Sequence, residues 1–149
     1  MQSILSKLAA FGNSLQSPLL LAIRLFWGGS FFVTGIGKFT HIEKTIAYFE
    51  SLGIPFATFS AFFVGSIETI GGACLFLGLF SRLASIPLMC IMIAVFMTAE
   101  TEALHKIFSD PQNFVQREPF SFLFASLLVF VFGPKAISFD YWLWKKTEK

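Results

Sequence analysis

Four long apolar runs constrain the fold of this chain more than any other feature of its sequence. Each run is continuous rather than alternating in its apolar character, which excludes the strands of a membrane barrel. A backbone surrounded by lipid must satisfy its own hydrogen bonds, and a helix does so within one segment. About 20 apolar residues suffice to cross a membrane as a helix. The sequence therefore predicts an all-α fold, a bundle of four transmembrane helices in which neighbouring helices are antiparallel. The predicted spans are approximately residues 18–38, 56–80, 83–99 and 119–133.

The composition supports this prediction and excludes other classes of protein. Hydrophobic residues make up 55% of the 149 residues, and charged residues only 13%. Soluble domains carry about 25% charged residues, so this chain has too little charge for a water-facing surface. The formal net charge of +2 offers no basic footprint for nucleic acid. Cys74 and Cys90 have neither dithiol nor zinc-site spacing, and they are predicted to be two buried small hydrophobic side chains.

The segments that flank the apolar runs are predicted to lie at the membrane surfaces. Residues 1–17 do not form a signal peptide, and their apolar side chains recur at the spacing of a short amphipathic interfacial helix. Residues 39–51 could form a short surface helix. Residues 18–140 then form the membrane domain, and residues 141–149 form an aromatic and basic tail typical of an interfacial anchor.

The placement of lysine and arginine predicts the orientation of the chain. Six basic residues fall on one side, four fall on the other, and Arg24 lies inside the first run, which accounts for all 11. The positive-inside rule therefore places both termini in the cytoplasm, with the chain as a multi-pass protein of a bacterial-type inner membrane. The six are Lys7, Arg82, Lys135, Lys145, Lys146 and Lys149, and the four are Lys38, Lys44, Lys106 and Arg117.

Glu68 is the strongest functional signal, because an ionisable group near the middle of a membrane helix usually marks a functional site. It shares a helical face with small residues, which predicts that it faces another helix. Arg24 lies on a similar glycine-bearing face of the first run, so Glu68 and Arg24 are the candidate catalytic residues. Three arrangements stay open: an Arg24–Glu68 link through a register shift or a water, an Arg24 that reaches the cytoplasmic interface, and a neutral Glu68 in an apolar pocket.

Further candidates for a pocket or an outer-face site are Lys38, His105, Glu118 and Arg82. Glu100, Glu102 and His105 have a spacing that could contribute to a divalent-metal site. Two carboxylates and one imidazole do not complete such a site, so these are interpreted as solvated loop residues and no metal site is expected.

The order and spacing of several short motifs resemble the DoxX family of small membrane proteins. The resemblance covers roughly residues 18–140, and it implies a four-helix membrane protein. It also implies a link to quinone-dependent sulfur oxidation, terminal oxidases, oxidative-stress enzymes or the assembly of receptors. Where many members have Gly-Pro-Gly, this chain has Gly133-Pro134-Lys135. The matching residues are Arg24-Leu25, Gly28, Phe31, Gly35, Lys38-Phe39, Gly53-Ile54-Pro55, Glu68, Gly71-Gly72, Gly78, Ser81-Arg82, Gly133-Pro134 and Ser138-Phe139-Asp140.

Three hypotheses for the function follow. The first is a subunit or accessory of a quinone- or thiol-linked membrane redox system, with quinone as the candidate cofactor and a membrane redox protein as the partner. The second is a non-enzymatic assembly or scaffold protein, because no complete catalytic constellation is evident in the sequence. The third is a small proton-linked carrier that acts as a homodimer, because four helices are too few for most transport pathways. Fold-level analogy is a weak guide among them.

Overall fold

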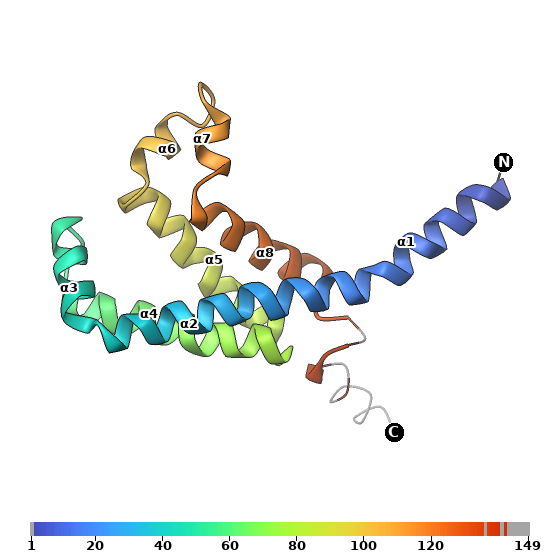
Figure 1. The fold of residues 1–149 in the computed structure, drawn as a ribbon, viewed down its shortest axis with the longest axis horizontal. Coiled ribbons are helices and arrows are strands. Elements are labelled where there is room, and N and C mark those ends of the chain that lie inside the picture. Colours follow the sequence, from blue (N-terminus) through green and yellow to red (C-terminus); the bar gives the residue numbers. More distant parts are fainter. Residues whose placement is uncertain (1, 136, 141, 143–149) are drawn as a thin grey trace.

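The structure is a computed structural model that describes residues 2–135, 137–140 and 142, and it is helical throughout its regular elements (Figure 1). No strand occurs within these ranges, so the predicted all-α class is confirmed. In chain order the elements are α1 (Gln2–Ile23), the π-helical turn η1 (Arg24–Gly28), α2 (Gly29–Thr40), α3 (Ile42–Ser51), α4 (Ala57–Leu77), α5 (Ser81–Thr98), α6 (Thr101–His105), α7 (Pro111–Val115) and α8 (Glu118–Phe132).

Three helical stretches are long and apolar enough to cross a membrane: Ile4–Thr40, Ala57–Leu77 and Ser81–Thr98. They correspond to the first three predicted spans. The fourth predicted span is the apolar helix α8, whose 15 residues fall short of the roughly 20 that a crossing usually needs. The surface helix predicted within residues 39–51 is present as α3.

The first span is longer than the sequence suggested. Elements α1, η1 and α2 form one continuous helical rod, and no break separates residues 2–17 from the span at Pro18 (Figure 1). The interfacial placement of residues 1–17 therefore stays a prediction, and so does the aromatic and basic tail. Of residues 141–149, only Trp142 lies within the described part of the chain.

The helices associate as two pairs, α2 with α4 and α5 with α8 (Figure 1). The α2–α4 pair is held by direct backbone contact. A Cβ atom built on Gly72 would lie 2.5 Å from the backbone nitrogen of Phe32, and one on Gly28 would lie 2.7 Å from that of Phe76. Small residues allow membrane helices this close approach. The predicted packing of the first two spans through their glycine faces is therefore confirmed.

The two pairs meet at the end of the molecule that carries the α4–α5 turn, here called the hairpin end. A Cβ on Gly71 would lie 3.0 Å from Leu88, so α4 and α5 are in close contact there. Toward the opposite end α5 diverges from α4, and α3 folds back beside the opening (Figure 1). This end, which carries α3, α6 and α7, is called the loop end. The divergence of the pairs creates the cavity in which the candidate site lies.

Candidate functional site: a cleft with a buried ion pair

A cleft of about 990 Å³ opens between the two helix pairs at the loop end. Its walls come from α3, α4 and α5, and the chain just before and at the start of α8 closes one side. This volume is at the upper end of the range of small-molecule sites. Aromatic side chains of Tyr48, Phe49 and Phe63 line it together with six charged residues, which are Lys38, Lys44, Glu68, Glu100, Arg117 and Glu118.

Glu68 and Lys38 form an ion pair in this cleft. Glu68 lies on α4 and is 3% exposed, and the Nζ of Lys38, in the last turn of α2, donates to its Oε2 at 2.5 Å. The carboxylate therefore faces a neighbouring helix, as its small-residue face predicts. Burial of a charge in lipid is costly unless it is paired, so the ammonium of Lys38 makes this placement tenable.

The Lys38 partner was missed at the sequence level, although a signal for it exists. Gly28 faces Gly72 and Gly35 faces Gly65 across the antiparallel pair, which sets the register. Helical side chains lean toward the N-terminus of their own helix. In this register Lys38 lies level with Gly65, one turn from Glu68, and the lean brings its long side chain back toward Glu68. The same lean carries Arg24 away.

Arg24 serves a different part of the molecule. It is 1% exposed, and its Nη1 and Nη2 donate to the backbone carbonyls of Pro134 and Ile137, each at 2.8 Å. The guanidinium thus binds the segment after α8 at the hairpin end. The Arg24–Glu68 link is not formed, and Arg24 does not reach an exposed interface either. A buried planar donor suits this role because it satisfies two carbonyls that no helix or strand pairs.

Asp140 contacts the α4–α5 turn beside Arg24. We call this region the hairpin lock, and it comprises Arg24, Pro134, Ile137, Asp140 and the α4–α5 turn. The carboxylate of Asp140 accepts hydrogen bonds from the backbone N–H groups of Phe80 at 2.7 Å and Ser81 at 3.1 Å. The backbone N–H of Asp140 donates to the carbonyl oxygen of Gly78. Asp140 therefore supplies, from 59 residues away, the N-cap that α5 lacks locally. Sequence reasoning noted Asp140 only as part of a motif.

An Asp140→Ala variant is expected to lose about 1–2 kcal/mol of stability, because two N–H groups at the start of α5 lose their acceptor. Thermal unfolding in detergent, followed by circular dichroism, measures the change. The matched control is Asp110→Ala, which removes the single 3.3 Å cap of the short exposed helix α7 and should leave the unfolding temperature nearly unchanged. Equal effects of the two variants would contradict the hairpin lock.

Of the remaining candidate site residues from the sequence, one lines the cleft and two lie elsewhere. Glu118 begins α8, and it lines both the cleft and a smaller adjoining pocket of about 160 Å³ that Lys38 and Glu68 also line. Arg82 lies at the hairpin end, where it packs against Gly133 and donates to the carbonyl of Val131 at 3.4 Å. His105 is exposed at the end of α6 and is not among the residues that line the cleft. The structure therefore brings together Lys38, Glu68 and Glu118.

Ion pairs engage two acidic residues of the segment between α5 and α8, Glu100 and Glu102. Arg117 pairs with Glu100 at 3.4 Å, which ties the end of α5 to the start of α8. Lys106 donates to Glu102 at 2.7 Å, and this hydrogen bond lowers the pKa of Glu102. Among the described residues, no group of three His, Cys, Asp or Glu side chains is placed to hold a metal ion.

The two cysteines differ from the prediction. Both are free thiols, but only Cys74 is partly buried, whereas Cys90 is exposed on α5. The prediction of two buried side chains was therefore wrong for Cys90. The physical reason is that an apolar membrane helix has the same composition on its lipid-facing and core-facing sides, so an apolar context does not indicate burial within the protein.

A comparison with protein families covers the part of the chain that supplies the buried ion pair. A family model described as DoxX matches residues 19–101, which include Arg24, Lys38 and Glu68 but neither Glu118 nor Asp140. The Bacillus subtilis (strain 168) protein named "Putative oxidoreductase CatD" is 36% identical over 83 residues, which are 56% of this chain and 60% of that protein. The Mycobacterium tuberculosis (strain ATCC 25618 / H37Rv) protein named "Uncharacterized membrane protein Rv3486" is 36% identical over 88 residues, 58% of this chain and 54% of that protein. The chain thus matches less than two thirds of either relative, and no solved structure matches it.

Proposed function

From the premise that the chain belongs to the DoxX family of membrane proteins, we propose that it binds a quinone in the ion-pair cleft. In this role it acts as a subunit or accessory of a membrane redox system. The observation that carries the proposal is the Lys38–Glu68 pair, which lies in a cleft with aromatic walls. The name of the Bacillus subtilis relative, with its reference to an oxidoreductase, supports the redox link.

The residues of the cleft suit the chemistry of a quinone ring. A lysine ammonium has three N–H donors, and Glu68 engages one, so others are available for a quinone carbonyl. Reduction of a quinone to a quinol consumes two electrons and two protons. In the proposal a partner redox protein supplies the two electrons, and water at the loop end supplies the two protons. The ionised Glu68 takes up these protons and passes them to the quinone whose carbonyl Lys38 binds. Tyr48, Phe49 and Phe63 supply the flat apolar surface for the ring.

The proposed membrane arrangement has four crossings, with α8 as the fourth. Its 15 residues span about 22 Å, so the bilayer must thin locally or polar flanking groups must reach inward. The loop end then faces the outer side, and the hairpin end and both termini face the cytoplasm of a bacterial-type inner membrane. Cysteine labelling with an impermeant maleimide at positions 102 and 135 tests this: label should reach the first in intact spheroplasts and the second only after lysis.

A Glu68→Gln variant is expected to bind a short-tailed, water-soluble quinone at least tenfold more weakly than the wild-type chain. The substitution removes the negative charge that orients the Lys38 ammonium while it keeps nearly the same shape. Titration of the detergent-purified protein with the quinone, followed by tryptophan fluorescence quenching, measures the affinity.

The matched control for this experiment is Glu102→Gln, which makes the same chemical change in an exposed surface pair with Lys106. Surface pairs contribute little to stability, so this variant should bind as the wild type does. A wild-type chain that binds no quinone, or a Glu68→Gln variant that binds it equally well, would contradict the proposed function.

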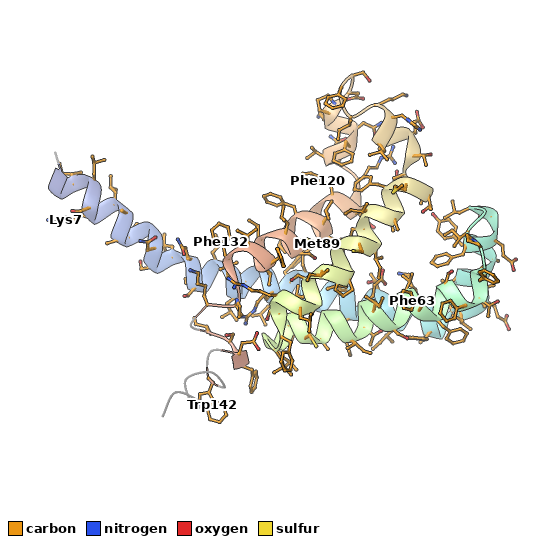
Figure 2. The ribbon with its side chains drawn as sticks, turned by 180° about the vertical axis from the view of Figure 1, so that it is seen from behind. Lys7, Phe63, Met89, Phe120, Phe132 and Trp142 are labelled. Atoms are coloured by element: carbon orange, nitrogen blue, oxygen red, sulfur yellow. The ribbon has the colours of Figure 1, made fainter. Side chains whose placement is uncertain are left out.

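One observation favours the assembly-protein alternative. Helix α1 projects beyond the bundle and carries Lys7 near its far end (Figure 2). Ile4, Leu5, Leu8 and Phe11 on it are all more than 60% exposed, which offers an apolar surface to another membrane protein. Recovery of a stoichiometric partner from native membranes, and its loss when Leu8 and Phe11 are both replaced by alanine, would support this alternative.

A further inference from the structure

A second cavity adjoins the cleft and lies along the α4–α5 hairpin. It is a groove of about 600 Å³ that runs along both helices. On α4 it extends from Phe59 to Cys74, which is about 22 Å along the helix axis. Among the described residues that line the groove, only Ser66 carries a hydroxyl group. This hydroxyl already donates a hydrogen bond to the carbonyl of Phe62. The groove therefore offers an apolar channel with no unmet demand for hydrogen bonds.

The groove and the cleft meet at one residue. Phe63 is the residue that lines both cavities among those described. Figure 2 shows Phe63 on α4, in the region where α5 has diverged from α4. Its side chain is 53% exposed, and it stacks on Phe59 with ring centroids 5.8 Å apart, so no buried packing holds it in place. Phe63 therefore lies between the charged interior of the cleft and the lipid.

The divergence of α4 and α5 explains why this passage exists. The two helices are in contact where Gly71 meets Leu88. The cleft ends before this contact, since its lining on α4 and α5 extends no closer to the hairpin end than Glu68 and Ile91. Nearer the loop end, Phe63 on α4 and Ile91 and Val95 on α5 line the cleft. A ligand in the cleft thus has a lateral route to the bilayer, between α4 and α5.

We infer that the ligand of the cleft is a membrane-resident quinone with a prenyl tail, whose ring lies at the Lys38–Glu68 pair and whose tail passes Phe63 into the α4–α5 groove. The inference rests on the proposed function and names its substrate class. A polar ring with a long apolar chain matches a charged cleft that continues into an apolar groove. Such a ligand enters from the lipid and not from the aqueous side of the membrane.

Tail-length dependence of binding tests the inference. The probes are two quinones with the same ring, one with a single isoprene unit and one with several, and affinities are corrected for their partitioning into micelles. The wild-type chain is expected to bind the longer probe at least tenfold more tightly. Ile70→Trp should abolish this preference and leave the short probe unaffected, because Ile70 lines the groove but not the cleft and is 65% exposed.

The matched control is Ile93→Trp on α5, which makes the same substitution at a position that is 48% exposed and lines neither cavity. It should keep the full preference for the longer probe. If Ile70→Trp also keeps it, or if the wild type shows no preference, the groove holds ordinary bilayer lipid and the inference is overturned while the proposed function stands. If neither probe binds the wild type, the proposed function itself fails.

A photo-crosslinking experiment gives a second readout that does not depend on affinity. A long-tailed quinone with a diazirine at the end of its tail is bound to the wild-type chain, irradiated and mapped by peptide mass spectrometry. Label is expected on the segments that line the groove, in particular near Ile70, Leu83 and Pro87. Label confined to α2 or α8 would overturn the lateral route.

Discussion

A Lys38→Met variant is expected to lose about 3 kcal/mol of stability, because it leaves the carboxylate of Glu68 buried without its partner. Removal of one member of a buried pair costs about 3–5 kcal/mol. The lower figure applies because the Lys38 side chain is 24% exposed in the cleft, whereas that of Glu68 is only 4% exposed. Unfolding of the purified protein in mixed detergent micelles, followed by tryptophan fluorescence, measures the difference.

The partner variant distinguishes a lost pair from general damage to the helix. Lys38→Met combined with Glu68→Leu should recover most of the lost stability, because the double change removes both charges and leaves an apolar contact. Lys106→Met, which breaks the exposed pair with Glu102, is the matched control and should change stability by less than about 1 kcal/mol. Additive losses in the double variant would show that Lys38 and Glu68 do not depend on each other.

A Gly72→Leu variant is expected to be still more damaging and to prevent accumulation of a monodisperse folded protein. Even the Cβ atom at Gly72 would lie 2.5 Å from the backbone nitrogen of Phe32 and 2.8 Å from the carbonyl oxygen of Gly28. Backbone atoms cannot rotate aside as a side chain can, so α2 and α4 must separate. Over-packing costs about 1–3 kcal/mol even where neighbours can adjust, and more where they cannot.

Fluorescence-detected size-exclusion chromatography of a tagged protein measures this outcome directly. Gly37→Ala is the control within the same glycine-rich helix pair, because a Cβ at Gly37 would meet no atom within 4 Å. Alanine is a better helix former than glycine by about 1 kcal/mol, so this variant should be neutral or slightly stabilised. A sharp, wild-type-like elution peak for Gly72→Leu would mean that the close α2–α4 contact does not hold the bundle together.

The Lys38→Met and Gly72→Leu predictions concern the cleft as well as the fold. The close α2–α4 contact sets the register that places Lys38 beside Glu68, and the Gly71–Leu88 contact sets the point from which α5 diverges. Both act at a distance from the proposed ligand. The cleft is therefore a consequence of how the helices pack, and small residues outside it position its charged groups.

The apolar runs by themselves determined the helices, because lipid leaves a long apolar segment no other way to satisfy its backbone. The glycine spacing likewise determined that the first two spans pack together, since only small residues permit that approach. The partner of Glu68 was decided by tertiary structure, because the choice between Lys38 and Arg24 depends on an interhelical register that no local pattern encodes. The role of Arg24 was likewise decided there. It requires the chain to turn at Gly133, where φ is +72°, and to return beneath the α4–α5 turn, a contact between residues more than 100 positions apart.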